Sequence, residues 1–414
     1  MTLPFPIQFA SNGPQWAQGF DAWYDYTKPQ GSQLLAFPPA TDTHSATVYA
    51  QSSSGGWQAI PANVPSRTDL GLQTVPTRTE ILTRSVFEGT PGATNRPTGW
   101  DRTGANASAL TLLSSENVAG FSTLVMQIRR VGVGLEGISQ SIATTAVQHE
   151  VSVFIRRPAG VTGSDAFFFE NTNLYRIASA ATINAQPSGV WVRYGITPTL
   201  TGSPTLLSFA SGNGGAGTGF DIAMPSVKIG AFVTPPIPTT GSSATVNGNQ
   251  QVVDLTGRLS AGVGIIFQWN QLAPSYTPAT FPRAFEFNDG TANNTLLLTD
   301  SGGAQMQSGA VAGGATQPTI ASVETNTWAS GVHTVALAAS NNYLMWREVG
   351  RAAPTALSSF AYPSITRLVF GGRAFDTTRN NYGLSVRAAL RFGAQDASTF
   401  ADLFAKATIL AAVS

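Results

Sequence analysis

The stretch that most constrains this chain lies at residues 219–245, where an apolar run gives way to prolines and a small polar segment. The first part alternates apolar with small or polar residues, which is typical of a half-buried last strand. Its apolar members are Phe220, Ile222, Met224, Val227 and Ile229. Pro235, Pro236 and Pro238 then fix φ and remove three backbone donors. Residues 235–247 are therefore predicted to be a semi-rigid linker between two β-domains, the alternative being an edge-strand exit within one domain.

Size and charge exclude several classes of function. A chain of 414 residues suits two or three domains. The net charge is +1, from 23 basic and 22 acidic residues, so we expect neither a nucleic-acid partner nor an anionic membrane surface. There is no cysteine, which excludes disulfides, thiolate metal sites and a cysteine nucleophile. The N-terminus has no signal-peptide pattern and no run is apolar enough to predict membrane insertion.

The region before the linker shows short strand signals at regular spacing. They are separated by Gly, Pro or Asn, and Val151, Val153 and Ile155 form one inward face. The predicted strands are 109–113, 120–128, 147–156, 166–170, 174–178, 189–196, 205–209 and 219–229. This pattern favours a sandwich of antiparallel sheets over residues 86–234.

Residues 248–414 follow a second strand pattern and end in a helix. The predicted strands are 252–255, 264–269, 284–289, 295–300, 331–338, 343–349, 365–372 and 384–392. Phe400, Leu403, Phe404 and Ala407 have helical spacing, and the Ser398-Thr399 pair offers a cap. The predicted fold class is all-β: two antiparallel β-sandwich (jelly-roll) domains after a short irregular N-terminal docking segment, with a short C-terminal helix.

The N-terminal segment, 1–85, is aromatic but too small to build its own core. Phe20, Trp23, Tyr24 and Tyr26 form a dense cluster, and Gly55-Gly56 suits a hairpin turn. The aromatics could form a docking surface for a partner, or they could pack under the next domain.

No stretch of the sequence makes a strong catalytic or metal-binding motif. Two carboxylate pairs, Asp289 with Asp300 or Glu286 with Asp289, could serve a glycosidase, but Asp289-Gly290 and Asp300 are also plain turn signals. His44, His149 and His333 are scattered singly, which argues against zinc. The glycine string at 211–217 lacks the context of a phosphate loop. We therefore predict no enzyme activity, no metal and no cofactor.

Three segments carry a family resemblance. The first segment consists of an Ala46-Thr47-Val48-Tyr49 strand, a glycine turn, and the stretches at 63–69 and 78–82. In this order, these features resemble the leader of a family of tailed-bacteriophage virion proteins. The chain departs from that pattern by inserting Ser66 before Arg67 and by having Glu80-Ile81 where Asn-Leu is usual. The strands at 191–194 and 219–223 resemble those of the family's galactose-binding-like jelly rolls. The strands around His333 and at 368–372 resemble a concanavalin-like or laminin-G-like jelly roll.

The resemblance implies a virion structural protein on the particle surface. Its expected role is a homotrimeric tail fibre or spike that attaches to a host surface polysaccharide, docked to other virion proteins through Phe20, Trp23, Tyr24 and Tyr26. The alternatives are a capsid fibre, decoration or adaptor protein with a purely structural role, and a glycan depolymerase.

Sugar binding needs an exposed aromatic ring together with planar donors and acceptors. Two places in the C-terminal domain supply them, although each could equally be a solvated loop or a subunit contact. The candidate glycan-binding residues are Asp376, Arg379, Asn381, Tyr382, Tyr276 and Arg283.

Overall fold

The computed structural model resolves the chain into two compact units that alternate along the sequence. It describes residues 14–27, 41–42, 47–64, 66–202, 205–230, 233–248, 250–272, 282–301, 305–324, 329–372 and 383–413. The C-terminal unit comprises Met1–Ala46, Ile60–Thr77 and Asn247–Ser414, and the central unit comprises Thr47–Ala59 and Arg78–Val246. These bounds differ from the predicted ones, because most of residues 1–85 belongs to the C-terminal unit and the proline segment belongs to the central unit.

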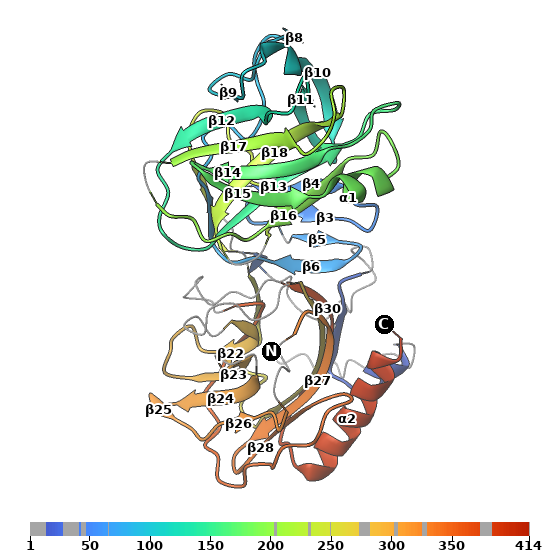
Figure 1. Ribbon diagram of the computed structural model, residues 1–414. Helices are drawn as coiled ribbons and strands as arrows, with labels where there is room; N and C mark the ends of the chain where they lie inside the picture. The colour runs from blue at the N-terminus through green and yellow to red at the C-terminus, as the bar shows by residue number, and fades with distance from the viewer. Residues whose placement is uncertain are drawn as a thin grey trace, which may run out of the picture. The chain divides into compact units, whose positions relative to one another are not determined.

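In the described residues of the C-terminal unit, two antiparallel sheets and two helices are found (Figure 1). The first sheet has the order β28-β27-β21-β30-β6-β5, with β1 also paired to β30. Its strands are β1 (Ala22–Asp25), β5 (Arg67–Thr68), β6 (Gly71–Thr74), β21 (Val263–Gln271), β27 (Gly331–Ser340), β28 (Tyr343–Glu348) and β30 (Gly383–Phe392). The second sheet has the order β2-β20-β29-β22-β23-β24-β25, with β26 paired to β24. Its strands are β2 (Thr41–Asp42), β20 (Gln251–Asp254), β22 (Arg283–Asn288), β23 (Thr295–Asp300), β24 (Met306–Ala312), β25 (Ala315–Thr316), β26 (Ile320–Ala321) and β29 (Arg367–Phe370).

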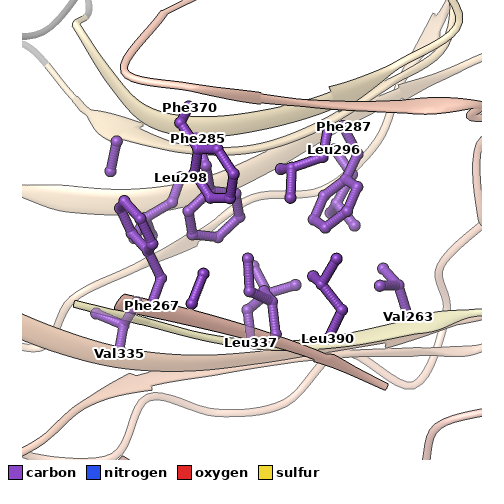
Figure 2. Close-up of a cluster of buried hydrophobic side chains, with 14 of the residues drawn as sticks. Val263, Phe267, Phe285, Phe287, Leu296, Leu298, Val335, Leu337, Phe370 and Leu390 are labelled. Atoms are coloured by element: carbon purple, nitrogen blue, oxygen red, sulfur yellow. The ribbon is translucent and has the colours of Figure 1, made fainter. Parts of the chain in front are cut away.

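The core of this unit lies between the two sheets (Figure 2). Val263, Phe267, Val335, Leu337 and Leu390 point from the first sheet toward side chains of the second. The facing side chains are Phe285, Phe287, Leu296, Leu298 and Phe370. Alternate residues of each strand therefore fill a continuous apolar layer, as in a β-sandwich.

The outer face of the first sheet is covered by the helices η1 (Gln15–Ala17) and α2 (Ala397–Ala411), and α2 lies against β27 (Figure 1). Phe20 belongs to the apolar cluster under these helices, and the half-buried Trp23 packs against it. Tyr24 and Tyr26, on and just after β1, are buried in the core between the sheets. Of the two interpretations of these aromatics, the structure favours packing under a domain over an exposed docking surface.

Helix α2 begins at a different cap from the predicted one. The expected buried face of Phe400, Leu403 and Ala407 is confirmed. The N-cap, however, is Asp396, whose carboxylate accepts from the Thr399 N–H at 2.8 Å, while the Thr399 hydroxyl accepts from the Asp396 N–H. The Ser398-Thr399 pair therefore lies inside the first turn, and Thr399 completes a reciprocal capping box.

Asp396→Ala should lower the free energy of unfolding of the C-terminal unit by about 0.5–2 kcal/mol, because the Thr399 N–H loses its acceptor. Denaturant unfolding followed by circular dichroism measures the change. Ser398→Ala, at an exposed position of the same first turn, is the control and should change stability by less than about 0.5 kcal/mol. Equal losses in the two variants would contradict the capping role.

The central unit is a second antiparallel sandwich with a separate core. Its larger sheet has the order β16-β13-β18-β11-β10-β8, with β7 bridging β18 and β19. These strands are β7 (Arg78–Glu80), β8 (Gly92–Ala93), β10 (Leu110–Val118), β11 (Phe121–Arg129), β13 (His149–Arg156), β16 (Val192–Ile196), β18 (Gly219–Ile229) and β19 (Ala244–Val246). Its smaller sheet has the order β15-β14-β17-β12-β9. These strands are β9 (Asp101–Thr103), β12 (Glu136–Ile142), β14 (Asp165–Glu170), β15 (Asn173–Ala178) and β17 (Thr205–Gly212).

Short elements complete the central unit. The helices are η2 (Ala107–Ala109) and α1 (Ala180–Ala185), and β3 (Val48–Gln51) pairs with β4 (Trp57–Ile60) in the hairpin predicted around Gly55-Gly56. Gly55 has a φ of 82°, which the turn requires and glycine allows. Trp57 of this hairpin packs against Phe154 and Ala223 on the outer face of the larger sheet. The all-β, sandwich fold class is thus what the structure shows, and no helix within the described ranges is long and apolar enough to cross a membrane.

The proline segment is hydrogen-bonded to the central unit and is not a free linker. The Thr234 N–H donates to Glu150 at 2.7 Å, and the Thr239 N–H donates to Ser85 at 2.9 Å. β19 then pairs with β7, with Thr245 opposite Thr79. The prolines do leave the sheet ladder as expected, but the residues between and after them bond back to the same unit.

Candidate functional site

A row of polar side chains crosses the outer face of the larger sheet of the central unit. The register places Thr111 opposite Gln127, Gln127 opposite Asp221, and Asp221 opposite Arg156. Val192 of β16 is opposite Ile155, so Trp191, which directly precedes β16, lies at the position opposite Arg156. Paired residues of neighbouring strands share a face. The residues on either side of Asp221 in the chain, Phe220 and Ile222, are in the core, so the row faces away from the core.

Asp221 fixes two arginines of this row. One carboxylate oxygen accepts from Arg129 Nη2 at 2.9 Å, and the other accepts from Arg156 Nη2 at 2.8 Å and Nε at 3.2 Å. Arg156 Nη1 also donates to Glu116 at 2.7 Å. The side chain of Asp221 is 2 % exposed, that of Arg156 16 % and that of Glu116 35 %, so the network runs from the sheet to solvent. Arg156 thus donates from three nitrogens to two carboxylates, which holds its guanidinium plane in one orientation.

The Arg156 guanidinium also lies over the Trp191 indole, 4.5 Å from the ring centroid. Burial alone would lower the pKa of Arg156, but the hydrogen bonds and charges of Glu116 and Asp221 raise it above its usual value. The cation is therefore permanent, and the stack is a rigid pair of planar groups.

The row offers hydrogen-bonding groups without a net charge. The two arginines balance Asp221 and Glu116. Within the described part of the chain, the Trp191 indole N–H has no acceptor, and the Gln127 amide and Thr111 hydroxyl make no side-chain hydrogen bond. A neutral, hydroxylated ligand suits such a surface, since it exchanges hydrogen bonds with the amide and hydroxyl groups, whereas the Trp191 indole N–H is buried.

Sequence reasoning noticed Trp191 as part of a resemblance but did not identify Arg129, Arg156 or Asp221. One signal was present: Asp221 is a charged residue between two apolar ones, Phe220 and Ile222. A buried carboxylate needs a partner, so this position predicts an arginine or lysine on a neighbouring strand.

Most of the predicted glycan-binding residues lie outside the described ranges, namely Tyr276, Asp376, Arg379, Asn381 and Tyr382. Arg283 is described, on β22, where it is 5 % exposed and forms an ion pair with the fully buried Glu286. Arg283 is therefore part of the interior of the C-terminal unit and offers little to a surface ligand.

The predicted carboxylate pairs do not form an open catalytic site. Glu286 has no exposed surface and accepts from Asn288 at 2.8 Å. Asp289 accepts from the Thr291 N–H and hydroxyl and from Asn294, so its turn role is confirmed. Asp300 is 1 % exposed at the end of β23. The glycine string joins β17 of the smaller sheet to β18 of the larger sheet, whereas a phosphate loop joins a strand to a helix.

The two described histidines have structural hydrogen bonds, as expected of strand residues. His149 Nδ1 lies 2.8 Å from the Val147 carbonyl, and burial lowers the pKa of this ring. His333 contacts Glu348 and the Ala329 carbonyl. His44 lies outside the described ranges. Over the described ranges, no group of three or more His, Asp or Glu side chains could hold a metal ion.

Comparison with known proteins gives a distant likeness only. No family model and no curated protein sequence matches the chain. Mouse laminin alpha1 domains LG4-5 align at 12 % identity and a TM-score of 0.25, over 61 % of this chain and 85 % of that one. A tandem CBM22-1-CBM22-2 domain of Paenibacillus barcinonensis Xyn10C aligns at 11 % identity and 0.28, over 76 % and 98 %. The extracellular region of zebrafish Gpr126/Adgrg6 aligns at 10 % and 0.22, over 66 % and 35 %.

Proposed function

We propose that this chain is a bacteriophage virion protein, a homotrimeric tail fibre or spike, that attaches to a neutral glycan on the host surface through the outer face of its central unit. The observation that carries the glycan contact is the pair of arginines, Arg129 and Arg156, that Asp221 fixes on this face. Arg156 lies over the Trp191 ring, and Gln127 is opposite Asp221 in the sheet. Sugars present hydroxyls and apolar C–H faces together, and this row combines planar polar groups with an indole.

The particle context rests on the sequence resemblance, in particular the stretches 46–49, 63–69 and 78–82. The chain carries 11 % charged residues, which leaves uncharged polar faces that suit contacts between copies. The proposed fibre also docks to other virion proteins. Because the aromatics Phe20, Tyr24 and Tyr26 are buried, other residues of the chain must make that contact.

Trp191→Ala should weaken binding of the full chain to its target glycan by about 30-fold, because a central aromatic anchor is worth about 2 kcal/mol. Gln127→Ala removes one neutral hydrogen-bonding group and should cost about fivefold. The measurement is titration of the full chain against the glycan that it selects on a glycan array. Val190→Ala, at the exposed neighbour of Trp191, and Ser122→Ala, on the exposed side of β11, are the matched controls.

Two further results test the particle role. Soluble full-length protein should compete with particles for adsorption to host cells, and equilibrium sedimentation should report a trimer. If the chain is instead a decoration or adaptor subunit, particles that lack it will still adsorb and the glycan array will be blank. Release of reducing ends from host polysaccharide would indicate a depolymerase and contradict a purely binding role.

A further inference from the structure

Three charged side chains lie side by side in the interior of the central unit. Lys228 on β18 is directly opposite Glu150 on β13, and it is also opposite Glu80 on β7. Paired residues of neighbouring strands share a face of the sheet, so the lysine stands between the two carboxylates. None of the three residues has any exposed surface, so bulk solvent does not reach them.

Lys228 is held in the way that a nucleophilic amine requires. Its Nζ forms an ion pair with Glu150 and donates to Ser226 Oγ at 2.7 Å. Burial lowers the pKa of Lys228 to about 8, because the protein interior opposes the charged form. A buried lysine of this kind supplies the neutral amine near neutral pH, and the neutral amine is the form that attacks a carbonyl carbon.

Glu150 is held in the way that an acyl acceptor requires. The Thr234 N–H donates to Glu150 Oε2 at 2.7 Å, and the Thr234 hydroxyl donates to Glu150 Oε1 at 2.8 Å. When a nucleophile attacks the carboxyl carbon, negative charge develops on the oxygens. Fixed donors that already point at these oxygens stabilise that charge, so Thr234 would act as an oxyanion hole.

Glu80 completes the group as a proton acceptor. The Ser226 hydroxyl donates to Glu80 Oε2 at 2.6 Å, and the same hydroxyl oxygen accepts from Lys228 Nζ. Ser226 therefore connects the amine to Glu80 through two hydrogen bonds, along which a proton can pass. Burial raises the pKa of Glu80, which makes it a stronger base than an ordinary carboxylate.

We propose that Lys228 and Glu150 condense into an amide bond that links β18 to β13 covalently. The Nζ lone pair attacks the carboxyl carbon of Glu150, a C–N bond forms, and one C–O bond breaks as water leaves. Nζ loses two protons: one crosses the ion pair to Glu150, and the other passes through Ser226 to Glu80, which returns it to the departing oxygen.

The reaction converts an ammonium and a carboxylate into an amide and water, so it needs no other reagent. It starts from the ion pair that the structure shows. It also removes two charges from the protein interior, where each is costly to bury. The bond concerns the construction of the central unit and does not depend on the proposed function.

Mass spectrometry of the full chain, purified and then denatured, tests the proposal. The protein should be lighter than its sequence by one water molecule, and peptide mapping should find a peptide with Glu150 joined to one with Lys228. Reductive methylation of the denatured chain should modify Lys28 and Lys406, the other two lysines, and leave the amide nitrogen of Lys228 unmodified. A full sequence mass with Lys228 methylated would overturn the proposal, and so would a missing water located at another pair of residues.

Variants test the roles of the two partners of Lys228. Lys228→Arg keeps a cation beside Glu150 but has no lysine amine, so this chain should show the full sequence mass. Glu80→Gln should slow bond formation by about 100-fold, the usual contribution of a positioned proton acceptor, as followed by the cross-linked fraction after a pulse of synthesis. Glu88→Gln, at a side chain of the same unit that is 43 % exposed, is the matched control and should leave the rate unchanged. Loss of water in Lys228→Arg, or an unchanged rate in Glu80→Gln, would contradict the mechanism.

Discussion

Lys228→Met is expected to lower the free energy of unfolding of the central unit by about 3–5 kcal/mol, since it leaves buried carboxylates without their cation. Lys228, Glu150 and Glu80 have no exposed surface. The Lys228 ammonium forms an ion pair with Glu150 and donates to Ser226 Oγ at 2.7 Å and to the Pro235 carbonyl at 3.2 Å. It therefore ties the sheet to the proline segment at one buried point.

Glu80 makes the loss of Lys228 more costly. Its carboxylate accepts from Ser226 Oγ at 2.6 Å and from the Val227 and Leu82 N–H groups. Burial raises the pKa of Glu80, and burial lowers the pKa of Lys228 to about 8. Both shifts show that the protein interior opposes charge here, so each charged group depends on the other.

Chemical denaturation with circular dichroism measures the loss as a shift of one unfolding transition. Lys406→Met, at a partly exposed position of α2, is the control. It should change the free energy of unfolding of either unit by no more than about 0.5 kcal/mol. Glu150→Gln combined with Lys228→Met should recover part of the loss, because the pair is then removed together. A loss of less than about 1 kcal/mol, the value of an exposed pair, would show that solvent reaches the cluster.

Strands with alternating apolar residues could be predicted from the sequence, and strands of small residues could not. β13, β18, β27 and β30 lie close to their predicted ranges. β12 was missed, because its sequence EGISQSI has little alternation. Its buried positions require small residues: a Cβ at Gly137 would lie 2.1 Å from the Phe209 carbonyl oxygen. Where two strands approach this closely, only small residues such as glycine and serine fit. The sequence of β12 therefore has no alternation of apolar residues from which a strand could be predicted.

The division into units could not be read from the order of the segments. β1 pairs with β30 at the other end of the chain, with Ala22 opposite Leu390. The sequence of a short strand does not show which distant strand it pairs with. The sequence therefore predicted residues 1–85 as a separate segment. The candidate row could not be predicted for the same reason. Gln127, Asp221 and Arg156 lie on three strands, and only the fold defines the register that places them side by side.

Tyr24 and Tyr26 should destabilise the C-terminal unit at alkaline pH, together contributing about 2.7 kcal/mol per pH unit above about pH 10. Burial raises the pKa of both phenols above the ordinary value, and each also lies beside the other, with stacked rings 5.8 Å apart. Above pH 10 the unfolded chain loses these two protons while the folded chain retains them. The unfolded state then binds fewer protons, so the free energy of unfolding falls as pH rises.

The measurement is tyrosinate absorbance recorded together with circular dichroism during an alkaline titration. Tyr26→Phe should lower the slope by about 1.4 kcal/mol per pH unit. Its cost at neutral pH should be small, because the Tyr26 hydroxyl is buried without a hydrogen-bond partner among the described residues. Tyr175→Phe, in the central unit, is the control, because it leaves the tyrosines of the C-terminal unit unchanged. The result also decides between the two interpretations of the N-terminal aromatics. Were they an exposed docking surface in the free protein, Tyr24 and Tyr26 would ionise near pH 10 with the fold intact, whereas core residues ionise only as the unit unfolds.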